Sequence, residues 1–200
     1  QTMINHSKSV RLGVDKSLMV FDMPYKTYRN PQEALKNAKL VLKETKCDAV
    51  KLEGGKKIIP IVKKLVQNKI PVMGHVGILP QTDKKFTFKG RKQRESERIL
   101  NDTKLLENAG AFSIVLECIE TKLSKKITNQ IKIPTIGIGS SSNCDGQVLV
   151  IDDLIGLTQS KFKFVKKYID MSKIIEGAVK KYRVDVLKKR FPKAKHSFKN

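Results

Sequence analysis

One repeated pattern restricts the fold of this chain more than any other feature. A short run of apolar, often β-branched residues ends in a polar or glycine-containing cluster, and a stretch with helical periodicity follows it. Because the runs are short and nearly continuously apolar, and one helix separates each from the next, we expect six parallel strands that are buried on both faces. The first five runs are SLMVFDMP (17–24), DAVKLEGG (48–55), IPVMGHVG (70–77), AFSIVLECIE (111–120) and IPTIGIGSS (133–141). The segment GQVLVIDDLIG (146–156) follows the fifth run.

The segments between the runs carry the signals of helix starts and stops. A helix is expected over residues 30–46, where Asn30 is a typical N-cap and Pro31 fits the first helical position. Another is expected over residues 91–110, and Gly110 is a typical residue for its end. Further helices are expected over 56–69 and 121–131, at the start of the chain, and in the C-terminal segment, which has the pattern of one or two basic amphipathic helices.

This pattern indicates an α/β fold, either an open doubly wound sheet or a (βα)8 barrel. Polar residues or glycines follow nearly every run, at the expected carboxyl end of each strand. In a barrel all of these ends converge on one mouth, whereas in an open sheet they spread along an edge. The pattern therefore favours a barrel, although six strands are fewer than the eight that a barrel needs. The residues at the strand ends are Asp22, Lys51, Glu53, His75, Glu117, Gly137 and Gly139.

The composition limits the partners and the compartment. The formal net charge is +22, from 41 lysines and arginines against 19 aspartates and glutamates, which raises the hypothesis of a nucleic-acid-binding protein. The lysines are dispersed along the whole chain, so we favour a lysine-rich surface and expect no nucleic-acid partner. Three cysteines without a CxxC pair favour a reducing cytoplasm. No apolar run reaches the roughly 18 residues that a membrane helix needs, so no membrane partner is expected.

Three carboxylates occupy costly positions in the sequence. Asp22, Glu53 and Glu117 each follow an apolar run, where a charge is expensive unless it is paired or bound to a metal. Each one alone could instead be a helix cap or a salt-bridge partner. Three of them on three strand ends favour a shared site, and two carboxylates that face one point suit Mg²⁺, a hard cation that keeps several of its waters.

Lys51 and Glu53 are two residues apart in an expected strand, so their side chains share one face. Glu53 could then hold the metal while Lys51 offers a positive charge to an anionic substrate. The alternative is a simple ion pair along the strand, worth roughly 0–1 kcal/mol if exposed. His75 could be an acid–base residue, but a lone histidine at a strand end is more often structural. Cys118 is expected to pack on the face opposite to that of Glu117.

Seven motifs follow one another along the chain: FDMPY, VKLEGG, PVMGHVGILPQ, LENAGAFSIVLEC, IPTIGIG, CDGQVLVIDDLIGLT and HSF. Together they resemble the ketopantoate hydroxymethyltransferase (3-methyl-2-oxobutanoate hydroxymethyltransferase) family, from about residue 10 to the end of the chain. The resemblance implies a (βα)8 TIM barrel of the phosphoenolpyruvate/pyruvate superfamily that is commonly decameric. It also implies an enzyme that transfers a hydroxymethyl group from 5,10-methylenetetrahydrofolate to 3-methyl-2-oxobutanoate. The product would be 2-dehydropantoate, for pantothenate and coenzyme A biosynthesis.

The resemblance further implies roles for four residues. Asp22 of FDMPY resembles a Mg²⁺ ligand that also lies at the substrate, and Glu53 of VKLEGG resembles a second Mg²⁺ ligand. Lys51 resembles the lysine that binds the keto acid, and Glu117 resembles the proton acceptor that leads to a Mg-stabilised enolate. We therefore expect Mg²⁺ as cofactor, 5,10-methylenetetrahydrofolate as co-substrate, small-molecule substrates, a homo-oligomer and a cytoplasmic location.

The chain departs from the family pattern at its N-terminus. The family begins earlier, with two strands of which the second carries a Gly-Asp-Ser motif that supplies a metal ligand and a substrate-binding serine. We therefore expect a single barrel domain over residues 1–200 that is N-terminally incomplete, with about six of its eight βα units and with C-terminal helices from about 160. Such a chain alone is expected to fold poorly or aggregate, because its first strand has an unpaired edge. The alternatives are another metal-dependent 2-keto-acid lyase or transferase of the same superfamily, and a non-catalytic truncated homologue.

Overall fold

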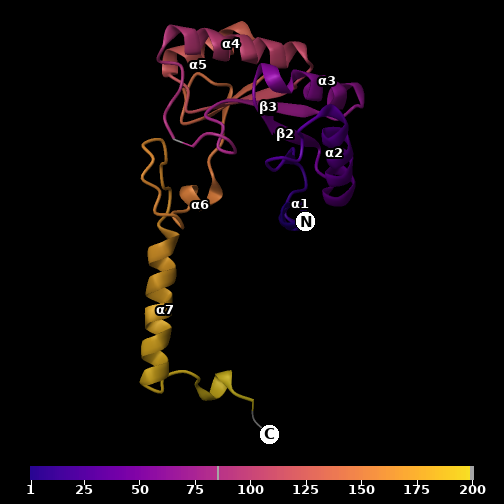
Figure 1. Ribbon diagram of the computed structural model, residues 1–200. Helices are drawn as coiled ribbons and strands as arrows, with labels where there is room; N and C mark the ends of the chain where they lie inside the picture. The colour runs from indigo at the N-terminus through magenta and orange to yellow at the C-terminus, as the bar shows by residue number, and fades with distance from the viewer. Residues whose placement is uncertain (85, 199–200) are drawn as a thin grey trace. The chain divides into compact units, whose positions relative to one another are not determined.

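The computed structural model describes residues 1–84 and 86–198, and the described residues contain one parallel sheet (Figure 1). The expectation of six strands is confirmed for this part of the chain. Each strand pairs in parallel with the next along the sequence, in the order β1-β2-β3-β4-β5-β6. The strands are β1 (Val20–Asp22), β2 (Ala49–Glu53), β3 (Val72–Gly77), β4 (Ser113–Glu117), β5 (Thr135–Ile138) and β6 (Gly146–Gln147).

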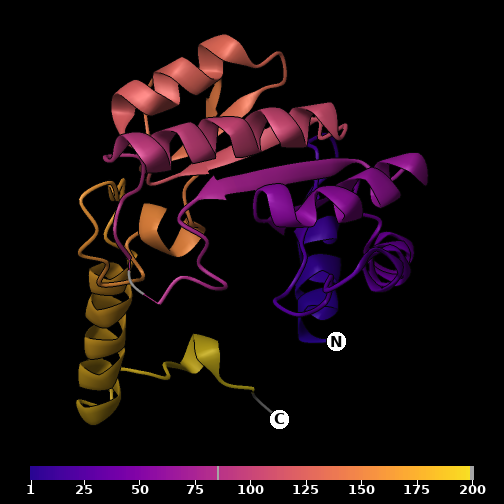
Figure 2. The same cartoon turned by 45° about the horizontal axis from the view of Figure 1, so that its top comes forward.

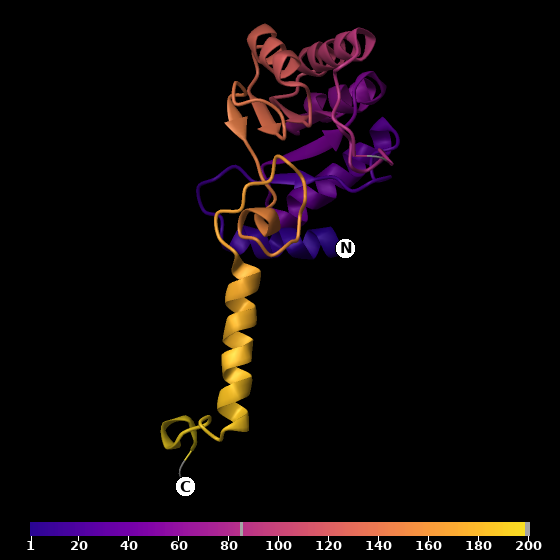
Figure 3. The ribbon, with the colours of Figure 1, turned by 90° about the vertical axis from the view of Figure 1, so that its left-hand side faces the viewer.

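The consecutive strand order decides between the two architectures that the sequence left open. A doubly wound sheet reverses its direction of winding at a switch point, whereas this order contains no reversal. Right-handed crossovers that all progress in one direction place their helices on one face of the sheet. Figures 2 and 3 show α3, α4 and α5 over one face of a curled sheet. The fold is therefore α/β with a half-barrel of six strands, consistent with part of a (βα)8 barrel.

The helices form a layer in which neighbours in the sequence are neighbours in space. α1 packs on α2, α2 on α3, α3 on α4 and α4 on α5, and α3 and α4 also contact the sheet. The bounds of these helices are α1 (Thr2–Leu12), α2 (Pro31–Thr45), α3 (Ile59–Gln67), α4 (Gln93–Asn108) and α5 (Thr121–Gln130), with the short 3-10 helix η1 (Lys56–Ile58) before α3.

The expected helix signals have their physical counterparts. The Asn30 side chain accepts a hydrogen bond from the Glu33 N–H at 2.9 Å, and Pro31 begins α2. Gly110 follows the end of α4 with a φ of 94°, a conformation that glycine adopts without strain. The helix expected over 56–69 is divided into η1 and α3 because Pro60, which has no N–H, is accommodated only in the first turn of an α-helix.

The two faces of the sheet have different chemistry. One face is apolar and fully buried under the helices, and it includes Val50, Leu52, Val72, Ile114 and Leu116. The alternate positions of the same strands project to the other face. That face carries the polar residues Lys51 and Glu53 of β2, His75 of β3 and Glu117 of β4. The interior of the half-barrel is thus lined by ionisable side chains near the carboxyl ends of its strands.

The chain divides by its internal contacts into two units, Gln1–Val148 and the residues from Leu149 onward, and each is described by itself. The second unit contains α6 (Ile151–Leu154), α7 (Met171–Leu187) and the 3-10 helix η2 (Ala194–His196). The expected C-terminal amphipathic helix is α7, which has no buried residue within the described chain. Among the described helices, each is too short or too polar to cross a membrane. A single domain over residues 1–200 stays a prediction.

Candidate active site

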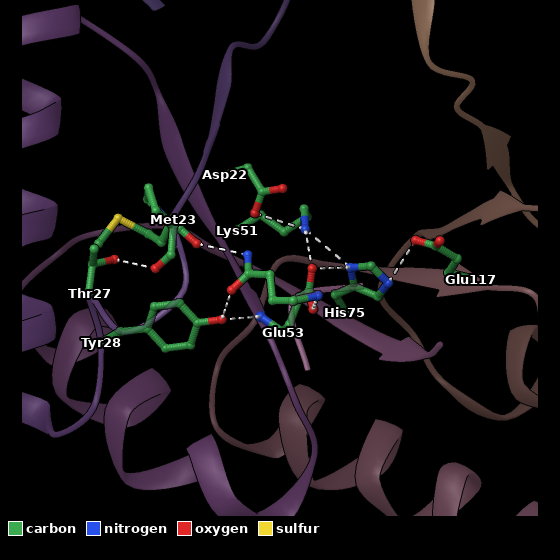
Figure 4. A network of polar contacts seen from close by, with 10 residues as sticks. Asp22, Met23, Thr27, Tyr28, Lys51, Glu53, His75 and Glu117 are labelled. Atoms are coloured by element: carbon green, nitrogen blue, oxygen red, sulfur yellow. Dashed lines mark hydrogen bonds and ion pairs between the residues drawn. The ribbon is translucent and has the colours of Figure 1, made fainter. Parts of the chain in front are cut away.

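The four residues singled out from the sequence lie in one cluster on the inner face of the sheet (Figure 4). Asp22 ends β1 and is the register partner of Lys51 on β2. The Lys51 ammonium is 2.9 Å from Asp22 Oδ1 and 3.9 Å from Glu53 Oε1. The expected sharing of one face by Lys51 and Glu53 is therefore confirmed, although the lysine contacts Asp22 more closely than its neighbour along the strand. The functional roles of these residues stay predictions.

His75 connects the two halves of this cluster, which the sequence alone did not indicate. It is the register partner of Glu53, and its side chain is 3% exposed. Its Nδ1 lies 3.1 Å from Lys51 Nζ, and its Nε2 lies 3.2 Å from Glu117 Oε2 on β4. Because a lysine ammonium only donates hydrogen bonds, Nδ1 accepts from Lys51 and the ring proton of the neutral imidazole lies on Nε2. That proton faces the Glu117 carboxylate.

Glu53 is held in place by a small polar shell from two loops. The backbone N–H of Gln81 donates to Glu53 Oε2 at 3.1 Å, and the Tyr28 hydroxyl donates to the Gln81 side chain at 2.8 Å. The Gln81 amide also donates to the Met23 carbonyl at 3.0 Å, which ties the shell to the end of β1. Sequence reasoning missed both partners. Gln81 belongs to the PVMGHVGILPQ motif, which could have drawn attention to it, whereas no pattern marks Tyr28.

Burial changes the acid–base properties of this shell. Burial raises the pKa of Glu53, and the nearby charge of Asp22 acts in the same direction. The Gln81 N–H and the charge of Lys51 oppose this effect because each stabilises the carboxylate form. Burial also raises the pKa of Tyr28 to about 12, so its hydroxyl remains a hydrogen-bond donor at neutral pH.

Cys118 follows Glu117 directly but is not part of the cluster. Its thiol is buried, and burial together with the charge of Glu117 raises its pKa to about 11. A thiol with such a pKa is protonated at neutral pH and is a poor nucleophile. This agrees with a packing role for Cys118.

Asp22 and Glu53 have the chemistry that a magnesium ion requires. Both supply carboxylate oxygens, and they are close enough for the charge of Asp22 to affect the pKa of Glu53. Asp22 Oδ1 is buried without a hydrogen bond of good geometry, although the Lys51 ammonium is near. The described residues hold no group of three or more metal-binding side chains. Two carboxylates nevertheless fit Mg²⁺, which commonly binds through one or two carboxylates, waters and substrate oxygens.

Comparisons of the sequence with a family model and with curated proteins agree on one family. The model of the family described as ketopantoate hydroxymethyltransferase matches residues 1–194. A 3-methyl-2-oxobutanoate hydroxymethyltransferase of Pelagibacter ubique (strain HTCC1062) is 61% identical over 196 residues, covering 98% of this chain and 76% of the relative. Proteins of the same name from Chlorobaculum tepidum and Carboxydothermus hydrogenoformans are 45% and 46% identical, covering 98% and 99% of this chain and 74% of each relative.

Proposed function

Because the chain belongs to the ketopantoate hydroxymethyltransferase family, we propose that it transfers a hydroxymethyl group to 3-methyl-2-oxobutanoate in pantothenate biosynthesis. The product is 2-dehydropantoate, and the one-carbon donor is 5,10-methylenetetrahydrofolate. The structural observation that supports this reaction is the chain of contacts from Asp22 through Lys51 and His75 to Glu117. It joins carboxylates, a cation and a base at the carboxyl ends of neighbouring strands, where barrel enzymes perform their reactions.

Asp22 and Glu53 are the residues that would hold Mg²⁺. When bound, the ion supplies a Lewis acid that polarises the 2-keto group of the substrate. The position of Lys51 between these two carboxylates limits how much negative charge they accumulate before substrate arrives. The positive charge of Lys51 thus offsets negative charge that would otherwise repel an anionic keto acid.

Lys51 provides the positive charge for the substrate carboxylate. Its side chain is 16% exposed and is fixed by Asp22 and by His75 Nδ1, so the ammonium is oriented before the substrate binds. A fixed cation in a partly buried site stabilises an anion more than a mobile surface lysine does, because less water screens the charge. The negative charge that develops on the substrate when its proton leaves is stabilised by the same ammonium.

Glu117 accepts the proton from C3 of the keto acid. The C–H bond next to the carbonyl breaks, its electron pair stays on the substrate, and the proton moves to the Glu117 carboxylate. The resulting carbon nucleophile forms a bond to the one-carbon unit, whose two bonds to nitrogen in the folate break. Water supplies the oxygen of the hydroxymethyl group, and the proton from C3 together with one proton from water ends on the two nitrogens of the departing tetrahydrofolate. Glu117 lies on β4, across β3 from Glu53, so the base is separate from the pair of carboxylates that would hold Mg²⁺.

The test is product formation by the protein expressed from its full reading frame. With Mg²⁺, 5,10-methylenetetrahydrofolate and 3-methyl-2-oxobutanoate, mass spectrometry should detect 2-dehydropantoate at a rate that depends on all three components. A panel of other 2-keto acids, with and without folate, separates this reaction from a lyase or a different transfer of the superfamily. Turnover of another keto acid without folate, and none of the expected product, would contradict the proposal.

Assembly as a homo-oligomer and a cytoplasmic location are also proposals.

A further inference from the structure

A closed ring of hydrogen bonds connects the end of β2 with the loops that follow β1 and β3 (Figure 4). The Glu53 N–H donates to the Tyr28 hydroxyl at 3.4 Å, and that hydroxyl donates to Gln81 Oε1 at 2.8 Å. The ring closes where the Gln81 N–H donates to Glu53 Oε2 at 3.1 Å. A branch runs from Gln81 Nε2 to the Met23 carbonyl at 3.0 Å. The ring therefore links Glu53 to the residue directly after Asp22.

Each hydrogen bond in this ring has only one possible direction. A backbone carbonyl only accepts, so the Gln81 amide presents Nε2 to Met23 and Oε1 to Tyr28. The Tyr28 hydroxyl has a single proton, which it gives to Gln81, and its oxygen accepts the N–H of Glu53. Inversion of the amide would set two acceptors against each other. The ring thus has a single arrangement, and its members are held in fixed places.

Both loops of the ring are also anchored outside it. The Asn37 side chain of α2 donates to the Thr27 carbonyl at 2.7 Å, next to Tyr28. After β3, the Asp83 N–H donates to the Leu79 carbonyl at 2.8 Å and closes a turn that contains the glutamine of the ring. These contacts limit the movement of the two partners of Glu53.

The ring leaves the two oxygens of Glu53 in different situations. Oε2 accepts the Gln81 N–H, whereas Oε1 lies 3.9 Å from the Lys51 ammonium. Asp22 Oδ1 lies 2.9 Å from the same ammonium, so each carboxylate has one oxygen near this point. Glu53 is thereby prepared to bind a cation through one oxygen. Such an arrangement suits Mg²⁺, which needs a small octahedron with oxygens at about 2.0–2.1 Å.

We propose that Tyr28 and Gln81 are positioning residues that make the site select Mg²⁺ over Ca²⁺, an inference that rests on the proposed function. Ca²⁺ accepts about six to eight oxygens at about 2.3–2.6 Å and often takes both oxygens of one carboxylate. The Gln81 N–H withholds Oε2 of Glu53 from such a contact, and Tyr28 acts through Gln81 by holding its side chain. Without the ring, Glu53 is free to turn both oxygens toward a cation.

The experiment measures the Kd values of Mg²⁺ and Ca²⁺ by calorimetry in the protein expressed from its full reading frame, without folate and both with and without saturating 3-methyl-2-oxobutanoate. In Tyr28→Phe and in Gln81→Met we expect the Kd of Mg²⁺ to rise about tenfold, while that of Ca²⁺ stays the same or falls. Because Tyr28 acts through Gln81, Tyr28→Phe should have little further effect in the Gln81→Met background. The matched control is Tyr25→Phe, which removes the hydroxyl of an exposed tyrosine in the same loop and should keep both Kd values.

The possible outcomes separate this inference from the proposed reaction. Absence of Mg²⁺ binding by the unsubstituted protein overturns both. Failure of that protein to form 2-dehydropantoate, with the expected changes in Kd, overturns only the reaction. A purely structural role would affect both ions alike, so equal changes for Mg²⁺ and Ca²⁺, unchanged Kd values, or additive effects in the double variant overturn the inference. If circular dichroism shows that Gln81→Met does not fold, Tyr28→Phe alone decides, because it keeps the aromatic ring that packs against the core.

Discussion

The Nε2 atom of His75 lies 3.2 Å from Oε2 of Glu117, and the imidazole thereby links the proposed base to the proposed substrate-binding lysine. His75 Nε2 is buried, and its alignment with Glu117 falls short of good hydrogen-bond geometry. Catalytic contacts of this kind are often loose before substrate binds and tighten in the complex. We interpret His75 as a positioning residue that fixes the direction of the Glu117 carboxylate while its Nδ1 holds the Lys51 ammonium.

Substitution of His75 by the two amides tests this interpretation. The His75→Gln side chain can reach the position of Nε2 and keep the contact with Glu117, whereas the amide of His75→Asn reaches only the position of Nδ1. Loss of a hydrogen bond to a charged group costs about 1.5–3 kcal/mol, so we expect kcat to fall roughly 10- to 100-fold further in His75→Asn than in His75→Gln. Exchange of the C3 hydrogen with D₂O, followed by NMR, should decrease in parallel. Equal kcat values in two folded variants would show that the contact with Glu117 does not matter.

Replacement of Lys51 should affect binding of the keto acid. Lys51→Met preserves the length of the side chain but removes the charge that lies 2.9 Å from Asp22, and Lys51→Arg retains a charge. Loss of a charge-assisted contact predicts a KM for 3-methyl-2-oxobutanoate that is roughly 10- to 100-fold higher in Lys51→Met. Steady-state kinetics at saturating folate measures this effect, and Lys51→Arg should be less impaired. Wild-type kcat/KM in Lys51→Met contradicts the assignment.

Glu117→Gln should remove proton transfer while leaving the shape of the site intact. The amide cannot accept the C3 proton, and general base catalysis typically contributes 10²- to 10⁴-fold, so we expect kcat to fall by about that factor. The KM for the keto acid should change little, because Asp22, Lys51 and Glu53 remain. C3 hydrogen exchange in D₂O without folate isolates this step from the later carbon–carbon bond. Exchange at the wild-type rate would exclude Glu117 as the base.

Several residues of this site could be predicted from local patterns in the sequence. The period of two residues in a strand places Lys51 and Glu53 on one face, and apolar runs that end in carboxylates indicate Asp22 and Glu117. The partners of His75 depend instead on the register of β2, β3 and β4, which a single sequence does not specify. The Tyr28–Gln81 shell depends on the conformations of two loops. These arise from contacts between segments far apart in the sequence and have no periodic pattern.

Gly77 is predicted to be a position at which even a methyl group disrupts the site. A Cβ there would lie 2.1 Å from the Glu117 carbonyl oxygen, and the residue has a φ of 102°, which L-residues rarely adopt. Gly77→Ala should destabilise the protein by about 2–4 kcal/mol, since both the backbone strain and the clash must be relieved. The control is Gly177→Ala in α7, where nothing lies within 4 Å and helix propensity predicts a gain of about 1 kcal/mol. Urea unfolding followed by circular dichroism measures both, and a Gly77→Ala variant of wild-type stability would contradict the close approach.

The thiol of Cys118 should be unreactive despite its place next to the proposed base. With a pKa of about 11, roughly one thiol in a thousand is ionised at pH 8, compared with about one in ten for a thiol with an ordinary pKa of 9.0. Because the shift is upward, labelling by iodoacetamide should increase as the pH rises toward 11 and should be rapid at pH 8 only after denaturation. Mass spectrometry of labelled peptides measures the rate, and Cys118→Ala should retain catalytic activity because Cys118 is not part of the contact chain from Asp22 to Glu117. Rapid labelling of the native protein at pH 8, or loss of activity in a folded Cys118→Ala variant, would contradict a packing role.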